Sequence, residues 1–250
     1  MRAVILQSAY MPWLGYFDLI AKSDVFIFLD DVQWRKRDWR NRNRIRTQNG
    51  WKWFTVPAKM EHDHSLEHSI HEIEIDNSRS WWVDHLNLFH NSYKRAPCFE
   101  EVFHDISSIL SVRHKRICDL NYEILKHLCL YLGIDYHFLY SQEMDIDPEL
   151  RKEDRLLAIL DIVKADTYLS GPGARNYLDK EKFNSRGITV EWHDYRHPYY
   201  SQELYRTDTF ISYLSVLDLL FHHGRESRDI LLCKKVIERP NGIRIKGAYE

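Results

Sequence analysis

The sequence lacks the features of a secreted or membrane-spanning protein, and its total charge does not point to nucleic acid. Its 250 residues include four cysteines without a CxxC pair, which favours reduced thiols over a disulfide framework. No basic segment followed by an apolar run opens the chain, and no apolar run reaches the roughly 20 residues that span a bilayer. A formal net charge of −2 gives no reason to expect nucleic acid or an anionic membrane as partner. We therefore expect a cytoplasmic protein without membrane insertion.

Three common catalytic and nucleotide-binding motifs are also absent. The chain contains no GxSxG, no GxxxxGK[ST] and no GxGxxG, which disfavours serine hydrolases, P-loop enzymes and ordinary dinucleotide dehydrogenases. Aromatic residues are abundant instead, at 14% of the chain with eight tryptophans. Such a surplus is typical of a pocket for flat or sugar-like ligands, or of a large core or interface.

Two strand–helix–strand patterns predict a parallel sheet. In each, a short apolar strand runs into a turn, a helix follows, and a second apolar strand returns, as in a right-handed crossover. The predicted strands cover residues 4–6, 25–29, 167–169 and 188–192, and the helices between them cover residues 16–22 and 174–184. We therefore predict an α/β fold with a Rossmann-like, mostly parallel sheet.

A helical region separates the two patterns. Its apolar side chains recur at helical spacing, and Gly133 is typical of the residue that ends a helix. Helices are predicted after Ser80 and over residues 99–110 and 113–132, and two more strands over residues 51–56 and 71–75. We predict one α/β domain over residues 1–250, with a helical subdomain at about 78–135 inserted between the two halves of the sheet.

Two carboxylates follow the second predicted strand. In open α/β sheets, ligands bind beyond the carboxyl ends of the strands, which is where Asp30 and Asp31 stand. Either is a candidate to bind a divalent cation or to act as a general base. The alternative is that one caps a turn and the other is solvated.

A run of basic residues interrupted by tryptophans comes next. Arginine side chains grip phosphate or carboxylate through two parallel hydrogen bonds, and indoles such as Trp34 stack on bases or sugars. The alternative is a solvated loop whose arginines pair with nearby aspartates. Because the run is short and the chain is not basic, the phosphate of a nucleotide or nucleotide-sugar fits better than RNA. The basic residues are Arg35, Lys36, Arg37, Arg40, Arg42, Arg44 and Arg46.

Two later segments are candidates for the other half of a site. Ser170 and Gly171 begin a loop that follows a predicted strand and opens a helix, where backbone N–H groups and Arg175 are suited to an anion. The alternative is that the glycines only shape the turn, and Pro172 removes one donor. His197 follows the last predicted strand and is the preferred general base, although a histidine satisfied by the backbone is the commoner outcome.

The histidine-rich stretch between residues 61 and 71 predicts no metal site. Zinc sites need three or four converging ligands, and no HExxH motif or cysteine pair supports one here. We interpret the stretch, which contains His62, His64, His68 and His71, as a polar surface loop.

Five separated blocks of this sequence resemble the WbqC-like family. They are QSAYMPWLGYFDLIAKSDVFIFLDDVQW, WRNRNRIRTQNGWKWFTVP, YLSGPGARNYLD, HPYYSQ and FISYLSVLDLLFHHG, and together they span residues 5–224. One departure is Ser8, where the family usually has proline, which alters the stiffness of a turn more than its chemistry. The shared blocks contain Gln7, Tyr10, Trp13, Gly15, Tyr16, Asp30, Asp31, Asn41, Arg42, Ser170 and Gly171.

The resemblance implies a transferase of bacterial surface-polysaccharide (O-antigen) biosynthesis. It would attach an aminoacyl group such as glycyl to the amine of a nucleotide-linked amino sugar, from an unidentified acyl donor for which aminoacyl-tRNA is one option. Asp30, Asp31 or His197 would take the proton of the amine, and Asn41 or the backbone at Gly171 would stabilise the oxyanion. The diphosphate would be held by Arg42, Arg44 or Arg175, and the sugar or base by Trp13, Tyr16 or Trp34.

Two alternatives stay open. The first strand–turn–helix faintly resembles the nucleotidylyltransferases, whose turn carries HxGH and which use ATP or CTP with Mg²⁺. Here Trp13 and Tyr16 replace both histidines, which puts adenylyl transfer in doubt. The other alternative is a non-catalytic subunit that binds a nucleotide-sugar. The oligomeric state is left open.

Overall fold

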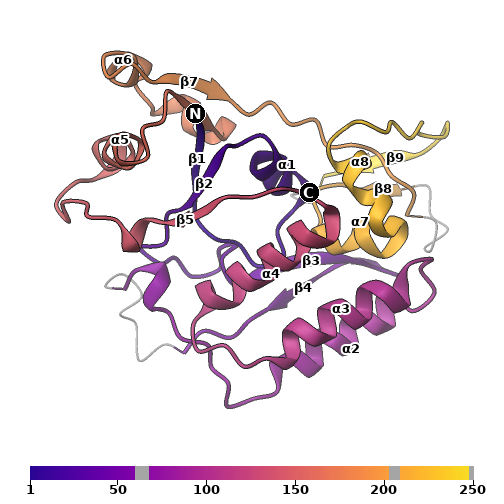
Figure 1. Ribbon diagram of the computed structural model, residues 1–250. Helices are drawn as coiled ribbons and strands as arrows, with labels where there is room; N and C mark the ends of the chain where they lie inside the picture. Colours follow the sequence, from indigo (N-terminus) through magenta and orange to yellow (C-terminus); the bar gives the residue numbers. More distant parts are fainter. Residues whose placement is uncertain (60–67, 203–208, 248–250) are drawn as a thin grey trace.

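A computed structural model describes residues 1–59, 68–202 and 209–247 of the chain. Its main sheet contains five strands, and all of their pairings are parallel (Figure 1). They are β1 (Arg2–Leu6), β2 (Val25–Phe28), β5 (Phe138–Tyr140), β6 (Thr167–Ser170) and β7 (Thr189–Trp192), in the order β5-β2-β1-β6-β7. This architecture confirms the predicted α/β, Rossmann-like parallel sheet.

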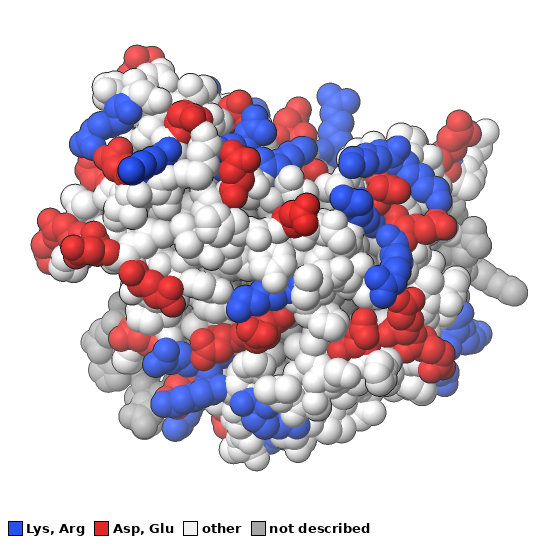
Figure 2. Space-filling view, viewed as in Figure 1, with Lys and Arg blue, Asp and Glu red and all other residues white. Residues whose placement is uncertain are grey.

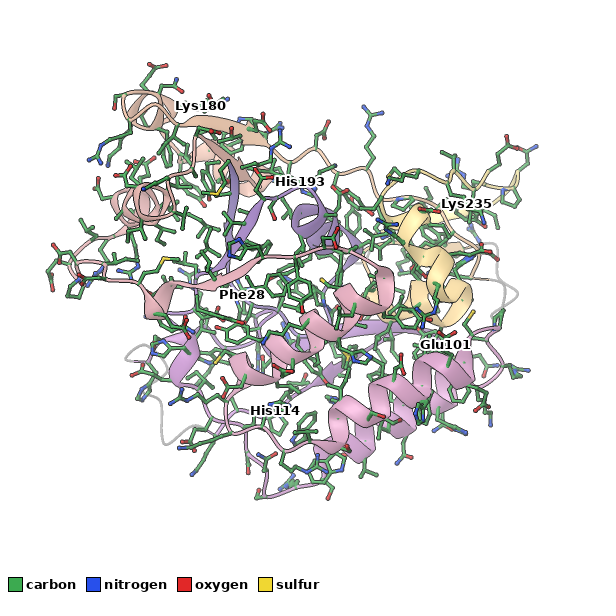
Figure 3. All side chains as sticks on the ribbon, viewed as in Figure 1. Phe28, Glu101, His114, Lys180, His193 and Lys235 are labelled. Atoms are coloured by element: carbon green, nitrogen blue, oxygen red, sulfur yellow. The ribbon has the colours of Figure 1, made fainter. Side chains whose placement is uncertain are left out.

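Helices cover both faces of the sheet. Successive residues of a strand point to opposite faces, so Phe28 packs on one side and its neighbour Ile27 on the other. Phe28 lies toward α4 (Figure 3). The helices on that side are α1 (Leu14–Ala21) and α4 (Ile117–Leu132), and those on the other side are α5 (Lys152–Ile162) and α6 (Lys180–Asn184). Gly133 follows α4 with a φ of +61°, as predicted for a residue that ends a helix.

The chain between β2 and β5 forms a hairpin and two helices before α4. The hairpin strands β3 (Arg42–Thr47) and β4 (Gly50–Thr55) are antiparallel and separate from the main sheet. After the short helix η1 (Ile70–Glu72) come α2 (Trp81–Tyr93) and α3 (Phe99–Ser111). The C-terminal part has the short parallel pair β8 (Thr209–Ile211) and β9 (Arg244–Lys246), with α7 (Val216–His223), η5 (Gly224–Glu226) and α8 (Ser227–Leu231).

Three local predictions are wrong. The arginine run is partly a strand, because side chains of β3 alternate between a face with Asn43 and Ile45 and a face with arginines. Residues 71–75, predicted as a strand, contain the end of η1 and only isolated bridges at Glu74 and Ile75. The helix predicted over residues 174–184 is divided into the 3₁₀ helix η3 (Pro172–Asn176) and α6.

The strand order places a crevice beside β1. From β1 the chain moves to β2 on one side, and its later strand β6 pairs on the other side. In open parallel sheets, ligands bind at the carboxyl ends of the strands where the order reverses. The residues after β1 and β6 are therefore the structural candidates for a binding site.

The surface charges and the helices bear on the expectation of a nearly neutral chain without a membrane-spanning segment. On the face shown in Figure 2, Lys and Arg side chains are interspersed with Asp and Glu, without a large area of one sign. Within the described part of the chain, none of the helices has the length and apolar character needed to cross a membrane.

Candidate active site

A cavity of about 220 Å³ lies at the carboxyl end of β1. Its wall is mainly apolar and aromatic, with one guanidinium and one amide. It is lined by Leu6, Ala9, Pro12, Trp13, Tyr16, Trp39, Arg40, Asn43 and Tyr213. Ligand pockets for whole drug-sized molecules are about 300–1,000 Å³, so this cavity fits a single ring with a few substituents.

Gly15 allows Trp13 to form one wall of this cavity. A Cβ atom at Gly15 would lie 2.2 Å from Cη2 of the Trp13 indole, so only glycine permits the ring to fold over the start of α1. The indole also packs edge-on against Tyr195 and tilted against Tyr213, with 5.4 Å between ring centroids in both cases. Two predicted residues, Trp13 and Gly15, thus act as a pair.

Two residues near the cavity, one in the loop before Trp13 and one in the C-terminal part of the chain, have a strained backbone. Met11 and Tyr213 have φ values of +44° and +58°, which L-residues other than Asn and Asp rarely adopt. Asn43 Nδ2 donates hydrogen bonds to the carbonyls of Tyr10 (3.2 Å) and Met11 (2.9 Å), and Ser215 Oγ donates to Met11 O at 2.7 Å. Strained non-glycine residues cluster at functional sites, and here they border the cavity.

Arg40 supplies the positive charge of the cavity. Its Nη2 donates to the side-chain oxygen Oε1 of Gln7 at 3.0 Å, and the Tyr16 hydroxyl donates to the main-chain carbonyl of Gln7 at 2.9 Å. Gln7 and Tyr16, both predicted, therefore meet at this arginine. Sequence reasoning did not single out Arg40, because nothing in the basic run distinguishes it from its neighbours until β3 removes Arg42 and Arg44 from the cavity.

Asp30 is a fully buried carboxylate behind this loop. Oδ1 accepts from Ser8 N at 2.9 Å, and Oδ2 accepts from the Tyr122 hydroxyl at 2.7 Å. Asn121 Nδ2 extends the network by donating to Ser8 Oγ at 3.1 Å. Burial raises the pKa of Asp30, although the donors from Ser8 and Tyr122 and the charge of Arg40 work in the opposite direction.

Asp31 holds the structure together. Its carboxylate accepts from Ser141 Oγ at 2.5 Å and forms an ion pair with Arg155, a residue of α5. Both partners are largely buried, and they tie the end of β2 to the end of β5. Asp31 is therefore held in place by groups of the protein itself.

Four other predicted residues face away from the cavity. Tyr10 is buried and donates to His85 Nδ1 at 3.0 Å, and Asn41 Nδ2 donates to the Val56 carbonyl at 2.7 Å. Trp34 is also buried in the core. The Arg42 guanidinium lies 4.1 Å from the centroid of the Trp53 ring.

Arg44 also packs against tryptophan rings, and with Arg42 it forms a stack of guanidinium groups and indoles on the hairpin. Its guanidinium carbon lies 4.9 Å from the ring centroids of Trp51 and Trp53 and 5.1 Å from that of Trp39. Trp39 also lines the cavity, so this stack buttresses one cavity wall.

Ser170, Gly171 and Arg175 lie at the carboxyl end of β6, beside the predicted crevice but outside the cavity lining. The Ser170 carbonyl accepts from His193 N at 2.8 Å. The Arg175 guanidinium lies 5.7 Å from the Trp192 ring centroid. Gly171 precedes η3, a five-residue 3₁₀ helix with Pro172 at its start.

His197 packs behind the cavity wall. Its ring centroid lies 5.0 Å from that of Tyr213, and Nδ1 donates to the Pro198 carbonyl at 2.9 Å. Burial lowers the pKa of His197 to about 4, so the imidazole is neutral near pH 7. It is thus a neighbour of the lining residue Tyr213 and has no place in the lining itself.

A buried hydrogen-bond cluster around Asp18, which sequence reasoning missed, fixes α1 beside this wall. His193 Nε2 donates to Asp18 Oδ2 at 2.6 Å, and Lys22 Nζ reaches the same oxygen at 2.6 Å. Figure 3 shows His193 beside α1. Burial raises the pKa of Asp18, but the hydrogen bonds from His193 and Lys22 outweigh it and lower the pKa overall. His193 stacks on Tyr195, which contacts Trp13.

A second buried network joins two of the sequence blocks. Asp218 is fully buried and accepts from the hydroxyls of Tyr93 (2.6 Å) and Tyr200 (2.8 Å) and from Gln202 Nε2 (2.7 Å). Tyr200 and Gln202 come from HPYYSQ, and Asp218 from FISYLSVLD. These contacts show that the two blocks stabilise the fold by binding to each other.

Residues 1–59, 68–202 and 209–247 contain no group of three or more His, Cys, Asp or Glu side chains placed to hold a metal ion. His62 and His64 of the histidine-rich stretch lie outside the described residues, and His68 is exposed. His71 Nδ1 lies 2.9 Å from Ser69 Oγ.

The fold and cavity define an α/β protein with a candidate ligand site at the carboxyl end of the central strand of a parallel sheet. The chain belongs to the WbqC-like protein family, whose sequence profile matches residues 7–230. It is also similar to an uncharacterized protein, Rv1507c, of Mycobacterium tuberculosis, with 38% identity over 231 residues that cover 92% of this chain and 97% of that one. No solved structure matches the chain.

Proposed function

We propose that the protein is a transferase that attaches an aminoacyl group such as glycyl to the amine of a nucleotide-linked amino sugar. It would act in the cytoplasm during synthesis of a bacterial surface polysaccharide. The observation that carries this proposal is the aromatic cavity at β1, in which a single arginine accompanies Trp13, Tyr16, Trp39 and Tyr213.

The composition of the cavity suits one ring of such a substrate. Indole and phenol rings pack against the faces of bases and sugars, and a guanidinium binds phosphate oxygens. The volume of about 220 Å³ accepts one ring, so the diphosphate and the second ring would extend past Arg40 along the carboxyl edge of the sheet. Ser170, Gly171 and Arg175 lie at the β6 end of that edge and are our candidates for contacts on the nucleotide side of the substrate.

Asp30 is our leading candidate for the proton acceptor. A carboxyl group with a raised pKa is better suited to take a proton than an ordinary one, since general bases work best near the operating pH. Asp31 is bound by Arg155 and Ser141, and the imidazole of His197 is packed behind Tyr213.

Mass spectrometry tests this proposal directly. Purified protein is incubated with a dTDP-linked amino sugar and a panel of glycyl donors that includes glycyl-tRNA. We expect the mass of the nucleotide-sugar to rise by one glycyl group, and dTDP-glucose, which has a hydroxyl in place of the amine, to stay unchanged. Absence of a mass gain with every donor would refute transfer.

A non-catalytic subunit that binds a nucleotide-sugar is the second candidate. It is favoured by the partners of both strand-end carboxylates, since Asp30 and Asp31 each bind two donors of the protein and neither lines the aromatic cavity. In that case the nucleotide-sugar raises the melting temperature, and Asp30→Asn leaves cellular function intact.

A further inference from the structure

A second hollow lies on the other side of Asp30. This groove has a volume of about 600 Å³ and lies at the carboxyl ends of β2 and β5, against the first half of α4. It is lined by His71, His114, Arg116, Cys118, Asp119, Tyr122, Glu123, Lys126, Tyr140, Gln142 and Glu143. It contains side chains of both charge signs, in contrast to the aromatic cavity. His114 marks its position in Figure 3.

Tyr122 connects the groove to the buried carboxylate. It borders the groove, and its hydroxyl donates its only proton to Asp30 Oδ2. Gln142 Nε2 donates to the phenol oxygen at 3.3 Å, which is a long bond. The oxygen has two lone pairs, so it can accept one further hydrogen bond.

The charges around Tyr122 suit an amine that also carries phosphate. Asp119 and Glu143 attract an ammonium group and Arg116 attracts phosphate oxygens, while Glu123 and Lys126 pair with each other at 3.1 Å. A nucleotide-linked amino sugar has both groups.

We propose that Tyr122 is the catalytic residue that receives the proton of the acceptor amine, with Asp30 as the final proton acceptor. This inference rests on the proposed transferase function and identifies where its amine binds. The ammonium N–H proton moves to Tyr122 Oη as the phenol proton moves to Asp30 Oδ2, so Tyr122 ends unchanged and Asp30 ends protonated. The neutral amine then attacks the carbonyl of an activated acyl ester or anhydride, and its second proton departs with the alcohol or acid that is released.

Burial prepares Asp30 for this role. The carboxylate is fully enclosed, and its Oδ1 is held by Ser8 N, so its Oδ2 stays aligned with the phenol. Loss of solvation favours the protonated carboxyl group, which is the state formed by the transfer.

Two readouts on matched variants test the relay. Binding of a dTDP-linked amino sugar is measured by calorimetry, and the single-turnover rate of glycyl transfer by mass spectrometry. The variants are Tyr122→Phe and Asp30→Asn, with Tyr131→Phe as control, because Tyr131 is another buried phenol of α4 that does not line the groove. The melting temperature of each variant reports whether it folds.

We expect Tyr122→Phe to lower the rate about 10²–10⁴-fold while Kd for the amino sugar changes less than tenfold, because a general base acts in the chemical step. The rate should recover as pH rises, since more of the amine is then already neutral. Tyr131→Phe should stay within threefold of the wild type. A folded Tyr122→Phe variant with a rate within threefold of an active wild type overturns the relay alone. A wild type that does not bind the dTDP-linked amino sugar, or that binds it without glycyl transfer, overturns the proposed function and the relay with it.

Discussion

Replacing Gly15 with alanine tests whether the indole of Trp13 forms a wall of the cavity. The new Cβ would lie 2.2 Å from Cη2 and 2.6 Å from Cζ2 and Cζ3 of that ring, whereas carbon atoms attract best at about 3.5–4.0 Å. The indole must therefore move away. It would lose its ring contacts with Tyr195 and Tyr213, which contribute about 0.5–1.5 kcal/mol each.

This loss is partly offset by the backbone. Alanine is favoured over glycine within a helix by about 1 kcal/mol. The net change in unfolding free energy is then a destabilisation of about 2 kcal/mol or less. The affinity for a ring ligand should fall at least tenfold, since about 1.4 kcal/mol of lost wall contact has that effect.

Urea unfolding and calorimetric titration with a dTDP-sugar separate these two effects. Gly173→Ala is the matched control, because its Cβ meets nothing within 4 Å. The expected outcome for Gly15→Ala is a destabilisation of no more than about 2 kcal/mol together with weakened binding, and for the control neither change. Unaltered affinity in a folded Gly15→Ala protein would show that the Trp13 wall does not hold the ligand.

Other predictions concern stability. Burial lowers the pKa of His85 to about 4, below its ordinary 6.5, so its stabilising contribution is complete above pH 6.5 and is lost as pH falls toward 4. The unfolding free energy should fall by up to about 1.4 kcal/mol per pH unit in that range, and His85→Gln should flatten the dependence seen in urea titrations. Asn43→Ala removes the side-chain donor of the buried Tyr10 carbonyl and leaves the Met11 carbonyl only its bond from Ser215, and should cost about 1–3 kcal/mol of unfolding free energy and weaken ligand binding; equal binding would contradict its role in shaping the loop. Tyr93→Phe removes one donor from buried Asp218 and the acceptor of the Arg46 N–H, and should lower the unfolding free energy by about 1–3 kcal/mol in the same assay, whereas no loss would show that this network does not stabilise the fold.

Local apolar patterns were sufficient to predict four of the five strands of the main sheet. Residues 4–6, 25–29 and 188–192 are short apolar segments beside turns, and they become β1, β2 and β7. β5 escaped prediction because Phe138–Tyr140 is only three residues long and is stabilised by pairing with β2. The charge of the arginine run is typical of a solvated loop, but Asn43 and Ile45 alternate with the arginines as in a strand.

The candidate site was only partly predictable. Trp13, Gly15 and Tyr16 stand on one turn and one helix, so their proximity follows from local sequence. Arg40 and Tyr213 reach the same cavity through tertiary packing, which no spacing in the sequence indicates. From the sequence, Tyr10 and Asn41 cannot be distinguished from ligand-binding residues. In the structure they form hydrogen bonds to His85 and Val56 in the protein interior.

The hydrogen bonds that hold the loop at Met11 come from the C-terminal part of the chain, so this loop depends on residues far away in the sequence. The hydrogen bond from Ser215 to the Met11 carbonyl joins residues 204 positions apart, and the backbone of Val216 bonds to Pro12. Bringing such distant residues together has an entropic cost that local contacts do not share. The first loop of the protein therefore takes its final shape only once its C-terminal segment has docked. Shortened chains that keep β1 through β7 would have strands for the sheet but no finished cavity.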